Sequence, residues 1–189
     1  MNLKVIKTIG VFGIFVLSFL AHNIYGWVPS NFVSLFFPIN ESIFEHMKII
    51  FTSTLLYGVI DYLLLKYNKI NFNNFSFQLF FTGFISIGIF LLIYLPIHYL
   101  LGESLIVTLI ILFITYIILE IISYYLLKIK DISILNKIAP IMIILVYINF
   151  IVLTYTSDKD DFFYDTYNTQ IYIDKNWWVL VISFVILLI

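Results

Sequence analysis

The sequence contains no cysteine and no arginine, and only 11% of its 189 residues are charged. The absence of cysteine excludes disulfides, thiolate metal ligands and cysteine nucleophiles. A formal net charge of −1 argues against nucleic acid or an anionic surface as a partner. Hydrophobic residues make up 62% of the chain, and its mean hydropathy is +1.07. So little polar surface does not cover a soluble globule, and we predict that a bilayer surrounds most of the chain.

Apolar runs long enough to cross about 30 Å of hydrocarbon recur along the whole sequence. We therefore predict an all-α, polytopic integral membrane helical bundle that forms one domain over residues 1–189, with about six spans. The expected spans are 8–25, 42–65, 77–99, 104–127, 138–155 and 177–189. Residues 27–40 contain two prolines and are too short to span, so they predict an interfacial or re-entrant segment.

The distribution of lysine predicts the orientation of the bundle. Cytoplasmic loops of membrane proteins are enriched in lysine and arginine. Seven of the ten lysines fall on one side of the predicted topology, namely Lys4, Lys7, Lys66, Lys69, Lys128, Lys130 and Lys137. This places both termini in the cytoplasm. The abundance of Lys, Ile, Asn, Phe and Tyr is typical of an AT-rich bacterial genome, so we expect a bacterial cytoplasmic membrane.

The segment 38–48 concentrates polar chemistry in an otherwise apolar chain. It holds two glutamates, a histidine, a lysine, an asparagine and a serine. The predicted topology also brings all three histidines, His22, His46 and His98, to the outer ends of the first three long helices. At about 100° per residue, an arc of the second helix carries His46, Tyr57 and Asp61. We predict an outer polar cluster around His46 and a deeper pair, Asp61 and Glu120, because intramembrane carboxylates usually face the interior.

These positions supply the candidate site residues. The predicted catalytic residues are Glu41, Glu45 and His46, and the predicted metal ligands are His46, His22 and His98. The predicted substrate-binding residues are Asn40, Ser42, Tyr25, Lys48, Tyr57 and Asp61. Histidine and carboxylate ligands without thiols suit a divalent transition metal such as zinc, iron or manganese. Glu45 and His46 point about 100° apart, so a site built on His46 with His22 or His98 is more natural.

Structural roles compete with these functional ones. Ser42 and Glu45 have the spacing of a capping box, and negative charge at a helix N-terminus is favoured by the helix dipole. Lys48 is three residues beyond Glu45, which is the spacing of an ordinary helical ion pair. The histidines at helix ends are also placed to form hydrogen bonds in the headgroup layer. The side chain of Asp61 is placed to extend toward Lys66 instead of facing the bundle interior.

Two stretches carry a resemblance to a known family. These are His22-x-x-Tyr25-x-Trp27 and the run from Phe37 to Lys48. They resemble the signature P-V-N-E-S-[IV]-W-E-H-x-K of an uncharacterised family of small multi-pass bacterial membrane proteins, with Ile39 for valine and Phe44 for tryptophan. The last outer loop matches that family only in part, because its proline and glycines are missing. The resemblance implies a six-helix or similar membrane architecture and supplies no activity.

Three functions are compatible with these features. The first is a hydrolase or transferase that acts on a lipid-type substrate at an outer, metal-binding site. The second is a small proton- or ion-coupled transporter that uses the polar positions from His46 through Tyr57 to Asp61 and Glu120. The third is an accessory subunit that binds a protein partner. In each case we expect membrane lipids as partners, and in the first two a lipid-like or small-molecule substrate.

Overall fold

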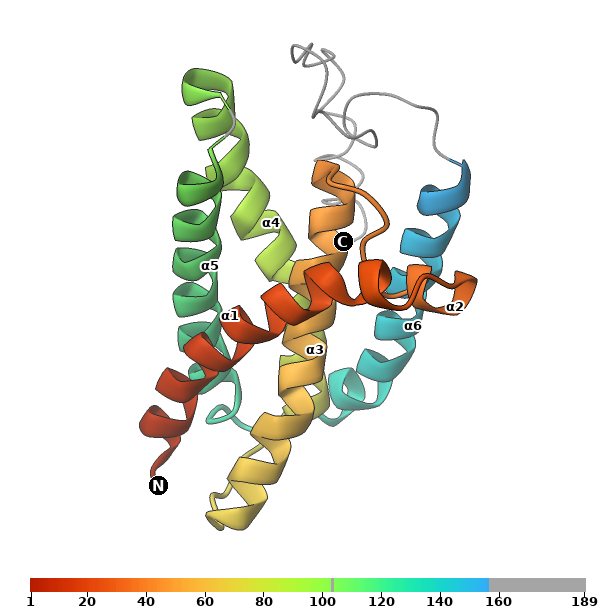
Figure 1. The fold of residues 1–189 in the computed structure, drawn as a ribbon. Coiled ribbons are helices and arrows are strands. Elements are labelled where there is room, and N and C mark those ends of the chain that lie inside the picture. The colour runs from red at the N-terminus through yellow and green to blue at the C-terminus, as the bar shows by residue number, and fades with distance from the viewer. Residues whose placement is uncertain (103, 157–189) are drawn as a thin grey trace.

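The computed structural model describes residues 1–102 and 104–156, and all the regular structure in this part of the chain is helical (Figure 1). The helices are α1 (Leu3–Trp27), α2 (Asn31–Ser34), α3 (Ile43–Tyr67), α4 (Phe75–Leu101), α5 (Leu105–Leu126) and α6 (Ser133–Thr156). The all-α prediction is therefore confirmed. The expected span 177–189 and the expected position of the C-terminus lie outside the described residues.

Five of these helices have the length and composition of membrane spans. They are 22 to 27 residues long, and at about 1.5 Å per residue even the shortest crosses the hydrocarbon layer. Large apolar side chains such as Phe12, Leu63 and Ile106 are exposed on their outer faces. Since these faces have no cover within the described chain and the helices have the length and composition of spans, the protein is a multi-pass membrane protein, as predicted.

Helix α3 is the centre of the bundle. In its most apolar window 61% of the residues are buried, against 11% for α6. Helix α1 runs obliquely across α3 and α5, while α4 packs against α3, α5 and α6 (Figure 1). Rings on α3 and α6, among them Phe51, Tyr147 and Phe150, contact each other edge to face. The buried polar residues of α3, among them Glu45, Lys48 and Asp61, therefore face other helices rather than lipid.

Local signals explain where the helices begin. Asn2 caps α1 by accepting a hydrogen bond from the Val5 amide at 3.0 Å, and Ser42 caps α3 by accepting one from the Glu45 amide at 3.2 Å. Helix α6 begins at Ser133, five residues before the expected start at 138. Pro140 consequently lies inside α6 rather than in its first turn.

One end of the bundle is held together by Asn74. Its amide donates to the Lys130 carbonyl at 3.1 Å and its carbonyl accepts from the Ile132 amide at 2.7 Å. The loops α3–α4 and α5–α6 therefore lie at the same end as the N-terminus, whose amino group contacts Asn68 at 2.7 Å. The loop before α3, which carries Glu41, lies at the opposite end.

Candidate functional site

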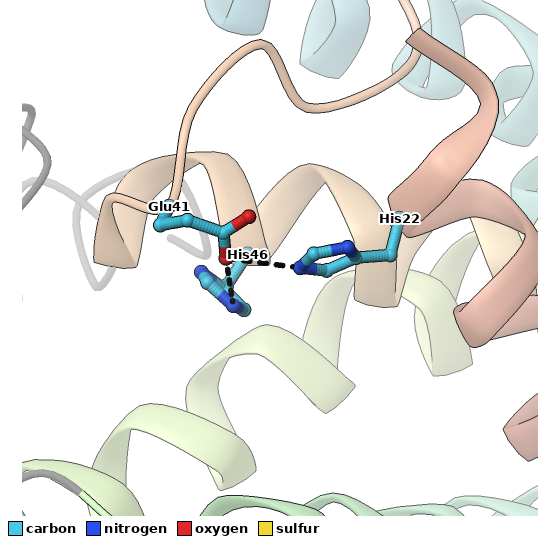
Figure 2. Close-up of side chains that lie close together, drawn as sticks. All are labelled: His22, Glu41 and His46. Atoms are coloured by element: carbon cyan, nitrogen blue, oxygen red, sulfur yellow. Dashed lines mark hydrogen bonds and ion pairs between the residues drawn. The ribbon is translucent and has the colours of Figure 1, made fainter. Parts of the chain in front are cut away.

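Two histidines and a glutamate meet at that opposite end (Figure 2). His22 lies near the end of α1, Glu41 in the loop before α3, and His46 in the first turn of α3. Glu41 Oε2 is 3.0 Å from His22 Nε2 and 3.7 Å from His46 Nε2. One ligand atom from each residue lies within 4.8 Å of the other two. The structure thus brings together three of the predicted site residues around one carboxylate oxygen.

The hydrogen bonds of His46 set its tautomer. Its Nδ1 lies 2.8 Å from the Ser42 carbonyl oxygen. A carbonyl only accepts, so Nδ1 carries a proton, and Nε2 presents a lone pair to Glu41 whenever the ring is neutral. A carboxylate and a lone pair that face each other repel unless a cation or a proton lies between them. Metal-binding histidines commonly have this arrangement, with one nitrogen bonded to a backbone carbonyl and the other free to ligate.

The spacing of the three side chains suits a transition metal. Zinc binds nitrogen and oxygen at about 2.0–2.2 Å, so neighbouring ligand atoms in a tetrahedron are about 3.3–3.5 Å apart. The observed distances of 3.0 and 3.7 Å lie on either side of this value. The two distances from the Glu41 oxygen are therefore close to those of a tetrahedral site, and the two histidine nitrogens lie within 4.8 Å of each other.

Exposure and electrostatics keep the cluster accessible. The side chains of His22, Glu41 and His46 are 36%, 42% and 28% exposed. The hydrogen bond from His22 holds the pKa of Glu41 below its ordinary value of 4.5, against the opposing effect of partial burial. Glu41 is thus an ionised carboxylate near neutral pH, which is the form that binds a metal.

A cavity of about 320 Å³ extends from the cluster between the helices. The cluster and a few other polar residues form one side of it, and apolar side chains form the rest. The lining comprises Ser18, Phe19, His22, Asn23, Glu41, His46, Ile49, Ile50, Phe90, Leu105, Thr108, Leu109 and Leu112. Phe19 and Leu105 are 45% and 75% exposed, so the apolar side of the cavity reaches the lipid-facing surface.

Glu45 and Lys48 are not part of this cluster. Glu45 Oε2 is 2.7 Å from Lys48 Nζ, and the two side chains are 3% and 0% exposed. Glu45 also accepts from the Ile39 amide and Thr154, while Lys48 donates to the Ser34 carbonyl. The predicted i, i+3 ion pair is present, and it joins α3 to α2 and α6. Glu45, predicted as a catalytic partner of His46, lies instead in this separate buried network.

The other predicted residues are spread over the structure. The Asn40 side chain accepts a hydrogen bond from the Ser42 amide at 2.9 Å. In a capping box the Glu45 side chain would accept this bond, so Asn40 takes its place. Ser42 is buried as the cap of α3, and Tyr25 is half-buried but does not line the cavity. His98 is buried on α4 with its ring stacked 5.0 Å from that of Tyr94, apart from the three clustered residues. Of the alternatives His22 and His98, the structure places His22 beside His46.

The deeper polar pair has an additional member. Asp61 is 2.5 Å from Lys7, and Glu120 is 3.4 Å from the same ammonium group. Asp61 therefore pairs with Lys7 rather than reaching toward Lys66, which corrects that expectation. Lys7 is 4% exposed within α1, so it is not a loop lysine as the orientation count assumed. Its position at the start of an apolar run resembled an ordinary flanking charge, and the sequence held no signal that it turns inward.

The whole chain matches one known family. The model of a family of unknown function (DUF6512) matches residues 2–187, which confirms the resemblance to an uncharacterised family. No curated protein and no solved structure matches the chain.

Proposed function

The chain belongs to this family of unknown function, and we propose that it is a membrane-embedded, metal-dependent hydrolase acting on a lipid-type substrate. The observation that carries the proposal is the convergence of His22, Glu41 and His46 on one point at the polar side of an apolar cavity. His22 and His46 are the proposed nitrogen ligands and Glu41 the proposed oxygen ligand. The donor set is that of known catalytic sites with two histidines and one carboxylate.

Three protein ligands would leave a coordination position open for water. A divalent ion held by these residues would lower the pKa of that water toward neutrality and would polarise a carbonyl or phosphoryl oxygen. One ion would then activate both the attacking water and the carbonyl or phosphoryl group that it attacks. The proton released from that water would pass to solvent, which reaches the partly exposed cluster, because Glu45 is held in its pair with Lys48. With an acceptor other than water, the same arrangement serves a transferase.

The shape and lining of the cavity favour a substrate with an acyl chain. Ile49, Leu109 and Leu112 give it an apolar interior, and its exposed members Phe19 and Leu105 face lipid. A chain that enters from the bilayer places its ester or phosphoester group at the level of the three polar ligands. A small polar substrate gains little from such a wall, because it has no apolar surface to bury against it.

Metal analysis of the purified protein tests the site. We expect near-stoichiometric zinc, iron or manganese in the wild type and its loss in His46→Ala and Glu41→Ala. His98→Phe is the matched control, because it removes a buried histidine outside the cluster and keeps a ring to stack on Tyr94. Metal-free wild type that retains its fold, or equal metal in His46→Ala, would exclude the proposal.

Lipid binding tests the substrate class. Native mass spectrometry of the wild type is expected to detect a bound lipid that is displaced by Leu109→Trp, which fills the cavity. Leu145→Trp is the control, since Leu145 is exposed on α6 and does not line the cavity. If both tryptophan variants retain the lipid equally, the cavity is not its binding site.

We also propose that the site faces the outside of a bacterial cytoplasmic membrane. Lys66 in the last turn of α3 and the loop residues Lys69, Lys128 and Lys130 lie at the end opposite Glu41, which supports this orientation. The cysteine-free chain allows a clean test with single cysteines. A membrane-impermeant thiol reagent added to intact cells is expected to label Asn31→Cys and not Lys130→Cys. The reverse pattern would turn the site toward the cytoplasm.

A further inference from the structure

A second cluster of charged groups is buried between α1, α3 and α5. Lys7 Nζ is 2.5 Å from Asp61 Oδ2 and 3.4 Å from Glu120 Oε2. All three residues are at most 4% exposed. None of them lies in the outer cluster or lines its cavity. The proposed hydrolase does not use them, although intramembrane charges are costly to bury.

The charges of this cluster do not balance when all its groups are ionised. Two carboxylates face one ammonium group, which leaves one uncompensated negative charge in a low-dielectric interior. The neighbouring helix α4 carries no Asp, Glu, Lys or Arg that would compensate it. A proton on one carboxyl group, or a second small cation, restores neutrality.

Several buried polar atoms around the cluster are also without hydrogen-bond partners among the described residues. These are Asp61 Oδ1, the Tyr57 hydroxyl, Glu120 Oε2 and the Ser123 hydroxyl. Tyr57 lies one turn before Asp61 on α3, and Ser123 follows Glu120 by three residues on α5. Tyr57 and Ser123 are 3% and 0% exposed. Unsatisfied polar atoms at this depth are places where water, an ion or an added proton restores the missing hydrogen bonds.

We propose that Lys7, Asp61 and Glu120 form a proton-binding site, in which Lys7 pairs with ionised Asp61 and Glu120 carries one exchangeable proton. Asp61 takes the ionised role because it lies 0.9 Å nearer to the ammonium group, at 2.5 Å against 3.4 Å. The exchange transfers a proton between the Glu120 carboxyl group and water, while Lys7 remains an ammonium ion. No oxidation or covalent step is involved.

The packing of α1 links this proton to the position of the helix. Gly10 faces Glu120 so closely that a Cβ on it would lie 2.7 Å from the Glu120 carboxyl carbon. Lys7 is three residues earlier on the same helix. A change in the position of α1 would therefore move the cation relative to both carboxyl groups and alter the number of protons that they need.

The hydroxyl groups of Ser18 on α1 and Tyr116 on α5 lie between the cluster and the outer cavity along these helices. The Ser18 hydroxyl lines that cavity and lies 2.6 Å from the Tyr116 hydroxyl. Tyr116 is one turn from Glu120 on α5. The cluster itself lies nearer the opposite end of the bundle, since Lys7 is 4 residues from the start of α1 at Leu3 and 15 residues from His22. It exists whether or not a metal binds in the outer site.

Infrared spectroscopy of the purified protein in nanodiscs at neutral pH tests the proposal. The wild type is expected to show one protonated-carboxyl C=O band that shifts in D₂O, and Glu120→Gln is expected to remove it. Asp61→Asn removes it as well, because Glu120 then ionises to balance Lys7. Lys7→Met roughly doubles its area, because both carboxyl groups are then neutral.

Asp131→Asn is the control, since Asp131 is exposed in the loop before α6 and its removal leaves the band unchanged. The proposal is overturned by a wild type without the band, or by a band that survives Glu120→Gln or Asp61→Asn. It is also overturned if the band appears only when sodium is omitted, because the cluster would then be a cation site. The opposite responses of Asp61→Asn and Lys7→Met separate charge balance from loss of fold.

Discussion

The segment 38–48 contributes to two neighbouring polar sites that differ in one respect. Glu45 and Lys48 are buried, and Glu45 accepts hydrogen bonds from the Ile39 amide, Lys48 and Thr154. Glu41, four residues earlier, is 42% exposed and shares one oxygen between two imidazole nitrogens. In the first site, the charged groups of Glu45 and Lys48 are paired with each other and with hydrogen-bonding groups of the protein. The second has capacity left for a ligand, and that difference is why we propose a functional role for Glu41 and a structural one for Glu45.

The geometry of α3 produces the separation. Consecutive residues on a helix point about 100° apart, so Glu45 turns toward α6 while His46 turns toward α1. The loop before α3 then sets Glu41 beside His46 rather than beside Glu45. A single turn of helix therefore divides the polar residues of one short segment between two surroundings.

The largest expected effect is the loss of the buried pair. Glu45→Gln leaves the Lys48 ammonium group without its counter-charge in the interior, and we expect a loss of about 3–5 kcal/mol in the free energy of unfolding. Thermal or denaturant unfolding in detergent measures it. Glu41→Gln, at a half-exposed position, is expected to cost less than about 1 kcal/mol. Equal losses in the two variants would remove the distinction between the sites.

A double substitution sharpens the same comparison. Glu45→Gln combined with Lys48→Met removes both buried charges, so it is expected to recover at least half of the loss seen in Glu45→Gln alone. The measurement is again the free energy of unfolding. Additive losses would show that Lys48 is stabilised by its bonds to Ser34 and Thr154 rather than by Glu45.

The all-helical membrane bundle was predictable from the sequence. A segment that crosses the bilayer must be a long apolar helix, and such segments are visible as long apolar runs. The part of the site formed by His46 and Glu41 was predictable from helical spacing and topology. The partner of His46 was not, since His22 and His98 are equivalent by sequence depth and only the packing angle of α1 distinguishes them. The inward turn of Lys7 was hidden for the same reason: it depends on the close approach that Gly10 and Gly13 permit.

A smaller effect is expected from pH. The pKa of Glu41 is lower in the folded protein than its ordinary value of 4.5, because His22 donates a hydrogen bond to it. The stabilisation is therefore fully present above pH 4.5 and is lost as the pH falls through the folded pKa. The difference in unfolding free energy between wild type and Glu41→Gln should shrink below that pH. A difference that grows toward acid pH would contradict the assigned hydrogen bond.

The most direct measurement of the central claim is the ligand environment of a metal in the outer site. Protein loaded with Co²⁺ or Zn²⁺ and studied by X-ray absorption is expected to show two imidazole ligands with oxygen donors. His22→Ala and His46→Ala are each expected to remove one imidazole from that signal, and His98→Phe to remove none. A metal without imidazole ligands, or one whose imidazole signal depends on His98, would contradict the account.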